Sequence, residues 1–497
     1  MKYISTRDNS VPVEASEAIV RGMVPSGGLF VPDMVPTLSG TELKSLVGAS
    51  YQTVAKTILG YYLSDFTADE IDEMVSAAYN TESFDSDAVA PLVKVKDGLY
   101  VLELWHGPTA AFKDMALQLL PHLLVHSMRK MNVDKEVVIL VATSGDTGKA
   151  ALEGFKDVDG TSIIVFYPDG GVSEVQELQM LTTGGSNTYT FAVRGNFDDC
   201  QRAVKEAFAN QSLNGAIDAL GCQLSSANSI NWGRLLPQIV YYFYAYLQLV
   251  AEGTVDFGDK INVTVPTGNF GNILAGWYAR EMGVPIGRLV CASNDNNVLD
   301  DFFKTGVYNA KRSFIKTISP SMDILVSSNL ERFLYLMDDC NGKEIESWMN
   351  SLKENGKFVI NDALRHRIGE VLSSGFVDEQ GTLKVIHDIF EETGYVLDTH
   401  TAVGVGVAQA LGGDEIMVVD STANPYKFVG AVTHALNGET PVEDDLALMQ
   451  PLADRSGMPV HRALDKLQEK PRRERKSIEV AEMNDEIMAV IRTRKAE

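Results

Sequence analysis

The sequence has few cysteines, a deficit of basic residues and no hydrophobic run long enough to span a membrane. Its four cysteines, Cys200, Cys222, Cys291 and Cys340, are far apart and show no metal-ligand spacing, so neither a disulfide framework nor a zinc site is expected. We expect small buried thiols in a reducing compartment. The most apolar stretch, 235–251, contains Pro237 and four tyrosines and is shorter than the ~20 apolar residues of a membrane span.

The shortage of positive charge excludes several classes of partner. Lys and Arg number 43 against 67 Asp and Glu, which gives a net charge of −24. Such a surface repels nucleic acid and anionic membranes, and an anionic substrate would need a locally positive pocket. The first seven residues lack the apolar run of a signal peptide, so we expect a cytoplasmic protein.

What the sequence does contain is a repeated unit of apolar strand, small polar loop and amphipathic helix. The strands are continuous runs instead of alternating ones, which indicates α/β architecture with mostly parallel sheets covered by helices on both faces. Ligands of such sheets bind beyond the carboxyl ends of the strands. The expected strands are 99–105, 136–142, 162–167, 188–193, 260–265, 289–292 and 415–419.

At 497 residues the chain is too long for one hydrophobic core, so several domains are expected. Residues 1–85, with short helices and a Pro/Gly-rich segment, predict an N-terminal subdomain. Residues 86–440 predict a two-lobed α/β core with a helical elaboration at about 296–397. Residues 441–497 predict a helical extension whose charged tail, 469–497, is expected to be a solvated helix.

Two loops between a strand and a helix are suited to binding anions. In the first, Gly268, Asn269, Phe270, Gly271 and Asn272 precede a helix whose free N–H groups and positive dipole end suit a phosphate. The spacing matches neither the nucleotide P-loop nor the dinucleotide motif, and a tight turn without a ligand is an equal alternative.

The second loop contains Thr143, Ser144, Asp146 and Thr147. These residue types also cap helices, and taken alone a cap is the better interpretation. Two such loops at the same edge of the architecture favour a ligand with two anionic groups.

Lys113 follows a strand and opens a strongly apolar helix, where its charge opposes the helix dipole. The ordinary fate of a lysine is a solvent-facing position. Partial burial beside a helix N-terminus would instead lower its pKa toward a reactive amine, as a Schiff-base lysine requires. His106 and His400 lie in loops without zinc spacing; substrate-contacting and structural roles are equally compatible with them, and no metal role is expected.

Taken together, these segments resemble threonine synthase of the bacterial and fungal type, a family of fold type II pyridoxal-phosphate enzymes. Any one segment is weak, but together they span nearly the whole chain in the family's order. The matching segments are 3–7, 27–32, 106–114, 143–148, 171–176 with 179–180, 195–200, 226–231, 266–272, 319–324, 328–329 with 331–332, 398–403 and 421–425.

The resemblance implies roles for particular residues. Lys113 would form the Schiff base with pyridoxal 5′-phosphate, and the backbone of Gly268 to Asn272 would hold the cofactor phosphate. Thr422 would contact the pyridine nitrogen and Asn228 the 3′-oxygen. The loop with Thr143, Ser144, Asp146 and Thr147 would face the carboxylate or the phosphate of the substrate. Position 272 is Asn where some relatives carry Asp, but its contribution should come mainly from the backbone.

The implied reaction converts O-phosphohomoserine and water to threonine and phosphate, with Lys113 moving the α-proton. One alternative is another enzyme of this fold, either a phospho-lyase or a threonine dehydratase. The other is a relative without cofactor that serves as a binding or structural protein, which the intact Lys113, phosphate loop and Thr422 argue against. The sequence is compatible with a monomer or a dimer.

Overall fold

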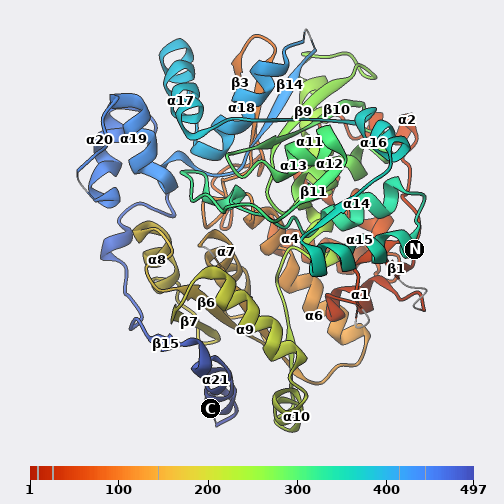
Figure 1. The fold of residues 1–497 in the computed structure, drawn as a ribbon, viewed down its shortest axis with the longest axis vertical. Helices are drawn as coiled ribbons and strands as arrows, with labels where there is room; N and C mark the ends of the chain where they lie inside the picture. Colours follow the sequence, from red (N-terminus) through yellow and green to blue (C-terminus); the bar gives the residue numbers. More distant parts are fainter. Residues whose placement is uncertain (8–10, 25–26, 144, 414, 443, 497) are drawn as a thin grey trace.

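Two largely parallel β-sheets form the frame of the computed structural model, which describes residues 1–7, 11–24, 27–143, 145–413, 415–442 and 444–496. In Figure 1 the six-stranded sheet lies in the upper part of the molecule and the five-stranded sheet in the lower part. The larger sheet has the order β13-β10-β9-β14-β4-β3 and the smaller one β15-β7-β6-β5-β8. Within these two sheets all pairings are parallel except that of β3 with β4. The architecture expected from the sequence is confirmed.

The strands follow the apolar runs of the sequence closely. The larger sheet contains β3 (Leu92–Lys96), β4 (Leu99–Glu103), β9 (Ile261–Pro266), β10 (Ile286–Ser293), β13 (Leu372–Phe376) and β14 (Met417–Ser421). The smaller contains β5 (Glu136–Ala142), β6 (Thr161–Pro168), β7 (Thr188–Arg194), β8 (Cys222–Ser225) and β15 (Ser477–Glu479). Because helices cover both faces, strand residues of either parity are buried, as along β5 and β6.

The helices of the core fall between these strands. They are α5 (Asp114–Leu117), α6 (Leu120–Lys130), α7 (Asp146–Phe155), α8 (Glu174–Leu181), α9 (Phe197–Ala209), α10 (Gln211–Ala219), α11 (Trp232–Ala251) and α12 (Gly271–Glu281). The sequence predicts one helical run from 113 to 131, whereas the structure has α5 and α6. The interruption lies just before Pro121, which has no N–H to donate to the preceding turn.

The N-terminal region packs against the larger sheet's helices. It consists of β1 (Tyr3–Ser5), α1 (Ala15–Arg21), β2 (Phe30–Pro32), α2 (Gly40–Ser45), α3 (Tyr51–Tyr62) and α4 (Ala68–Ala78). Tyr3 and Tyr62 lie against Trp232 of α11, with ring centroids 5.4 and 5.6 Å apart. This region therefore shares the main hydrophobic core and has no separate core of its own. The domain boundary expected at residue 85 remains a prediction.

The region from 296 to 397 is more than a helical elaboration. It contains α13 (Val298–Thr305), α14 (Leu330–Met337), α15 (Gly342–Asn355), α16 (Asp362–Gly369) and α17 (Glu379–Thr393) with the short strands β11 (Val307–Asn309) and β12 (Lys357–Val359). It also supplies β13, which pairs with β10 at the edge of the larger sheet. The pattern in 372–376, Leu-Ser-Ser-Gly-Phe, is too polar to predict a sheet strand.

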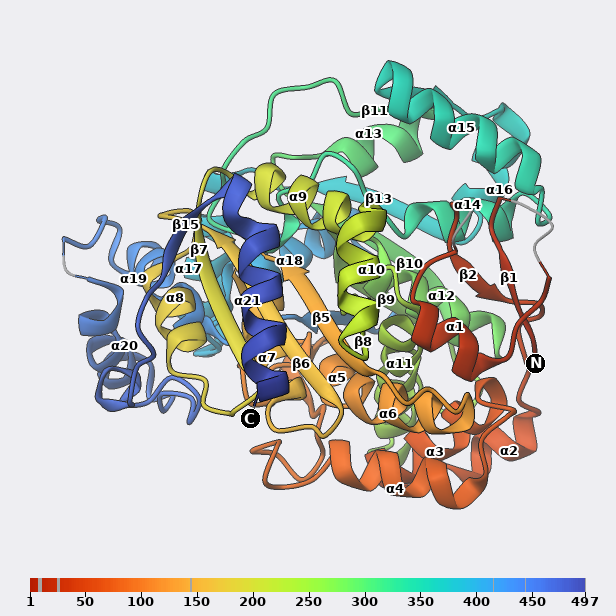
Figure 2. The same ribbon diagram turned by 90° about the horizontal axis from the view of Figure 1, so that it is seen from below.

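The tail differs from the expected solvated helix. The α-helices after 397 are α18 (Thr399–Leu411), α19 (Val429–Asn437), α20 (Met449–Ser456) and α21 (Met483–Ala496). Strand β15 pairs with β7, and Ile487 and Ile491 of α21 are buried against the smaller sheet. Figure 2 shows α9 and α21 side by side on this face. The expectation failed because the tail's few apolar residues are spaced among many charges.

Within the part of the chain that the structure describes, no helix combines the length and apolarity needed to cross a membrane. Nor do these residues contain a group of three or more His, Cys, Asp or Glu side chains placed to hold a metal ion. Three of the four cysteines are buried as expected, but Cys340 is exposed, and all four thiols are free.

Candidate active site

Lys113 stands where the loop after β4 turns into the short helix α5. Two backbone hydrogen bonds tie this loop to the segment after β14: Phe112 N–H donates to Thr422 O (2.9 Å), and Asn424 N–H donates to Ala110 O (3.0 Å). Because β4 and β14 are parallel neighbours, their carboxyl ends meet at one edge of the sheet. The fold thus brings Lys113 and Thr422 together from positions far apart in the sequence.

The Lys113 side chain is largely buried and reaches across to the smaller sheet. Its Nζ lies 3.5 Å from Asp146 Oδ2, at the start of α7, and 3.4 Å from Ser321 Oγ. Burial lowers the pKa of Lys113, and the nearby cations Arg234 and Lys427 lower it further, whereas Asp146 opposes the shift. The outcome is the buried, more easily deprotonated amine that the sequence analysis anticipated.

Asp146 is the centre of the polar contacts around Lys113. Its Oδ1 accepts from Gln176 Nε2 (3.0 Å) and lies 2.9 Å from Lys427 Nζ, and its Oδ2 accepts from Ser321 Oγ (3.1 Å). Burial alone would raise the pKa of Asp146, but Lys427 and Lys113 outweigh it and hold the pKa well below the usual range. Asp146 is therefore ionised and balances the charge of the nearby lysines. It would repel an anionic group of a substrate, so such a group would contact the surrounding cations instead of Asp146.

Lys427 is completely buried in the segment after β14. Besides Asp146, its Nζ donates to Thr109 O (2.9 Å) and to Gln179 Oε1 (3.3 Å). A buried ammonium group is stable only when it is paired and hydrogen-bonded in this way. Lys427 thus places a second positive charge beside Lys113.

The Thr143 hydroxyl performs the capping role that was the alternative interpretation. Thr143 Oγ1 accepts from the N–H groups of Gly145 and Gly148, both at 2.9 Å. Gly145 has a φ of 133°, and a Cβ there would lie 2.3 Å from the Gln176 side chain, so this position requires glycine. Thr147 is half-buried at the first turn of α7, and Ser144 lies outside the described residues. The substrate-binding assignments of this loop remain predictions.

The loop from Gly268 to Asn272 opens α12 without any side-chain cap. Phe270 adopts the left-handed φ of 61° just before the helix, which leaves the first N–H groups of α12 available to an anion. At Gly268 a Cβ would lie 2.7 Å from the backbone oxygen of Ser321. This close approach places the loop against the segment that also contacts Lys113.

Asn272 points into the core. Its Oδ1 accepts from the hydroxyls of Tyr241 and Tyr242, the latter at 2.7 Å. The Tyr242 hydroxyl oxygen also lies 2.8 Å from Asp420 Oδ2, and burial raises the pKa of Asp420 to about 7. The side chain at 272 therefore anchors the base of α12, in keeping with a backbone contribution to a phosphate site.

The two remaining candidates flank this centre. Thr422 is buried directly after β14. Asn228 is half-buried ahead of α11, and its backbone N–H donates to Ser226 Oγ (3.2 Å). Among the described residues, neither the Thr422 hydroxyl nor the Asn228 amide has a hydrogen-bond partner, so both groups are free to contact a ligand.

Several site residues were not singled out from the sequence. Ser321 and Gln176 appeared only within family segments, and Lys427 and Arg234 were not chosen. Arg234 is the only charged residue of α11, a signal that could have identified it, and it is buried with one hydrogen bond to Ala227 O (2.8 Å). Burial lowers the pKa of Arg234 to about 10.

Each of the two loop histidines is held by hydrogen bonds to neighbouring residues of the protein. His400 Nε2 accepts from Ser321 N–H (3.1 Å), and its Nδ1 lies 3.0 Å from Asp398 Oδ1, so the ring props the segment that contacts Lys113. His106 lies between Asp85 Oδ1 (2.6 Å) and Glu103 Oε2 (2.9 Å). Burial opposes its protonation, but the two carboxylates outweigh burial and raise the pKa of His106 to about 9.

Models of three protein families match the chain in succession. They are "Threonine synthase N terminus" over residues 2–79, "Pyridoxal-phosphate dependent enzyme" over 75–421 and "Threonine synthase, C-terminal" over 401–486. The central model alone covers more than half of the chain.

Individual relatives agree with the family models. Threonine synthase of Pseudomonas aeruginosa is 40% identical over 89% of this chain and 92% of its own length. Human "Threonine synthase-like 1" is 41% identical over 90% of this chain, which spans only 62% of that relative. Among solved structures, the pyridoxal-phosphate-bound threonine synthase of Brucella melitensis matches with a TM-score of 0.87 at 36% identity, over 100% of both chains. The yeast enzyme matches with a TM-score of 0.88 at 34% identity, over 99% of both chains.

Proposed function

This chain belongs to the threonine synthase family of pyridoxal-phosphate-dependent enzymes, and we propose that it converts O-phosphohomoserine and water to threonine and phosphate. The observation that carries the proposal is the position of Lys113. Its buried Nζ lies between Asp146 and Ser321, where the loops of both sheets meet.

The residues present fit pyridoxal phosphate. The start of α12, which has no side-chain cap, suits its phosphate, and the Lys113 amine suits its aldehyde. The Thr422 hydroxyl, which has no hydrogen-bond partner among the described residues, suits its ring nitrogen. We assign Asn228 to its 3′-oxygen. When bound, the cofactor supplies an electron sink for a negative charge at the α-carbon.

Within this site we assign proton transfer to Lys113 Nζ, which removes the α-proton of the substrate. The lowered pKa of Lys113 supports this role, because only the neutral amine accepts a proton. Ser321 and Asp146 orient the amine, since both lie within 3.5 Å of it. A β-proton is then removed and phosphate leaves the γ-carbon, which is reprotonated to a methyl group. Water adds its hydroxyl at the β-carbon, and a proton returns to the α-carbon to give threonine.

The substrate carries a phosphate and a carboxylate, and the protein is strongly acidic overall. Arg234 and Lys427 are buried cations close enough to Lys113 to lower its pKa, so they form the local positive region that such a substrate needs. We propose that they attract the anionic groups, while the backbone N–H groups of Asp146 and Thr147, next to those that donate to Thr143, bind one of them. The free thiols of the chain are in keeping with a cytoplasmic location.

Product analysis tests this proposal. Purified protein is incubated with O-phosphohomoserine in oxygen-18 water, with and without added pyridoxal phosphate. We expect threonine and phosphate in a ratio near one to one, cofactor dependence, and the label on the threonine hydroxyl. Predominant 2-oxobutyrate with equimolar ammonia would instead identify a lyase or dehydratase of the same fold, and no cofactor-dependent product would identify a non-catalytic relative.

A further inference from the structure

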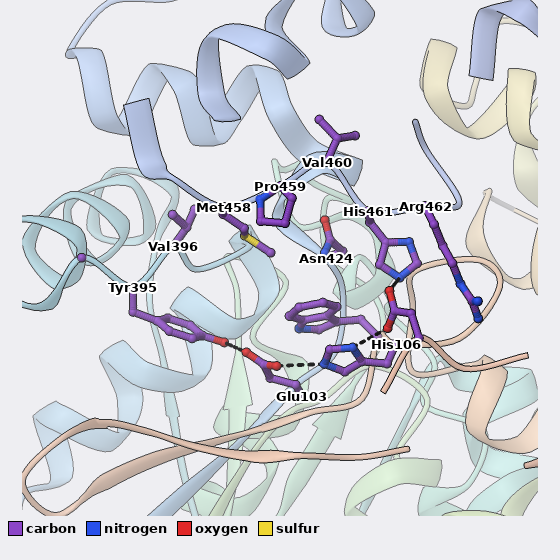
Figure 3. A pocket seen from close by; sticks show the side chains of 13 residues that line it. Glu103, His106, Tyr395, Val396, Asn424, Met458, Pro459, Val460, His461 and Arg462 are labelled. Atoms are coloured by element: carbon purple, nitrogen blue, oxygen red, sulfur yellow. Dashed lines mark hydrogen bonds and ion pairs between the residues drawn. The ribbon is translucent and has the colours of Figure 1, made fainter. Parts of the chain in front are cut away.

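A cavity of about 400 Å³ lies behind the loops that carry Lys113 and Thr422. Its walls come from the loop after β4, the link between α17 and α18, Asn424, and the segment 458–462 (Figure 3). Neither Lys113 nor the loop 268–272 lines it. Its volume falls in the range of small-molecule sites, which is about 300–1,000 Å³.

One wall is an ordered chain of hydrogen bonds, drawn in Figure 3. The Tyr395 hydroxyl donates to Glu103 Oε1 (2.6 Å), and the other Glu103 oxygen bonds to His106. His106 in turn bonds to Asp85, and His461 Nε2 lies 3.0 Å from the second Asp85 oxygen. The chain fixes two carboxylates at the cavity, and each carboxylate oxygen can accept more than one hydrogen bond.

Asn424 contributes a buried donor that has no partner. Its side chain is fully buried, its Oδ1 accepts from Tyr426 N–H (3.0 Å), and its Nδ2 has no hydrogen-bond partner among the described residues. A buried donor left without an acceptor is costly, so a ligand acceptor at this position would be favoured. Arg462 lines the same cavity and adds a positive charge.

The rest of the lining is apolar. Trp105 is stacked on His106, with ring centroids 4.2 Å apart, and Val396, Met458 and Pro459 also line the cavity. The cavity therefore combines an apolar interior with carboxylate acceptors and an amide donor. A ligand that satisfies all three carries an ammonium group, a carboxylate and a short apolar side chain.

We propose that this cavity binds the zwitterion of a small apolar α-amino acid. Its carboxylate accepts from Asn424 Nδ2, its ammonium group donates to the carboxylates of Glu103 and Asp85, and its side chain packs against Trp105. This assignment does not depend on the reaction proposed above.

The site is connected to the catalytic loops, so its occupation affects activity. Trp105 Nε1 donates to Ser421 Oγ (3.0 Å), one residue before Thr422. Asn424 N–H donates to Ala110 O, three residues before Lys113. A ligand held by Trp105 and Asn424 therefore acts on both segments that position the cofactor site.

Calorimetric titration of the cofactor-loaded protein with L-leucine tests the proposal. Two analogues of leucine test the two charged groups separately: 3-methylbutylamine lacks the carboxylate, and 4-methylpentanoate lacks the ammonium group. We expect saturable, one-to-one binding of leucine, and at least tenfold weaker binding of both analogues, because each loses a charge-assisted contact worth about 1.5–3 kcal/mol. Equal affinity for leucine and either analogue, or no leucine binding at 10 mM, would overturn the assignment.

Two variants separate this cavity from the catalytic site, where an amino acid could also bind. Met458→Trp fills the cavity and should abolish leucine binding, and Asn424→Leu removes the donor and should weaken it at least tenfold. The cofactor absorbance reports binding at Lys113. Leucine binding that survives Met458→Trp and shifts this absorbance would place the ligand at the catalytic site and contradict the proposal. The proposed function is tested separately, by threonine formation from O-phosphohomoserine, and this result would not bear on it.

Discussion

Lys427 Nζ lies 2.9 Å from one oxygen of Asp146, whose other oxygen faces Lys113 Nζ at 3.5 Å. One buried carboxylate is thus shared by two buried lysines. This arrangement keeps Asp146 ionised and confines the positive charges of Lys113 and Lys427 to one side of the site. It also makes the stability of the site depend on Asp146.

The first prediction concerns this counter-charge. Asp146→Asn leaves Lys427 buried without its partner, and breaking a buried pair in this way costs about 3–5 kcal/mol. We expect the free energy of unfolding of the cofactor-free protein to fall by this order, measured by urea denaturation. The double variant Asp146→Asn/Lys427→Met should recover much of the loss, because the unpaired ammonium group is gone. The single variant Lys427→Met completes the comparison. A loss in the double variant equal to the sum of the losses in Asp146→Asn and Lys427→Met would show that the two residues do not act as a pair.

The second prediction compares two glycines of the loop before α12. At Gly268 an added Cβ would lie 2.7 Å from a backbone oxygen of Ser321, whereas at Gly271 its nearest contact is Asn329 Nδ2 at 3.4 Å. Gly268→Ala must therefore move the segment beside Lys113. Overpacking costs about 1–3 kcal/mol, which corresponds to roughly a 5- to 150-fold loss of cofactor affinity.

Gly271→Ala is the matched control, since a methyl group fits there at ordinary contact distance. Cofactor affinity, measured by fluorescence titration of the cofactor-free protein, should be close to that of the unmodified protein for Gly271→Ala. Similar losses in both variants would indicate that the loss of glycine itself, and not the contact with Ser321, is responsible.

The third prediction concerns His106 and pH. The pKa of His106 is raised to about 9 in the folded protein, from an ordinary value of 6.5, by Asp85 and Glu103. The protonation of His106 therefore stabilises the folded protein fully below about pH 6.5, by up to about 3 kcal/mol. This stabilisation is lost as the pH rises through 9. The pKa of Asp420 is raised to about 7, so its contribution to the free energy of unfolding is lost between about pH 4 and 7. This range lies below most of the range from pH 6.5 to 9 in which His106 titrates.

The comparison of the unmodified protein with His106→Gln isolates this effect. The difference between their free energies of unfolding should shrink between pH 6.5 and 9.5. A difference that is constant over this range would mean that His106 does not change its charge there. Direct titration of the imidazole by NMR, assigned with the same variant, provides an independent measurement.

The sequence predicts much of the frame because the buried strands are continuous apolar runs. The prediction for 136–142 coincides with β5, and those for β6, β7 and β9 differ by one or two residues. Strands β13 and β15 were missed because their short, polar segments are stabilised by a neighbouring strand instead of by their own composition. Tertiary pairing of this kind leaves no local signal.

The site likewise contains some residues that the sequence indicates and others that only the fold brings together. Lys113 was selected because a lysine at the start of an apolar helix is locally unfavourable. Lys427, Gln176 and Ser321 are important only because the fold brings them to Asp146, and their sequence distances from it reach 281 residues for Lys427 (427 − 146). Thr143 was considered as a possible cap. The N-cap residue of α7 is Gly145, and the Thr143 hydroxyl accepts from the N–H groups of Gly145 and Gly148 at the start of that helix.

The identity of the cofactor-bearing lysine is the most direct test of this account, since Lys113 and Lys427 flank the same carboxylate. The protein loaded with pyridoxal phosphate is reduced with borohydride, digested, and analysed by mass spectrometry. We predict the pyridoxyl group on Lys113, and no reducible linkage in a folded Lys113→Ala variant. A pyridoxyl group on Lys427, or on any other lysine of the unmodified protein, would contradict the account.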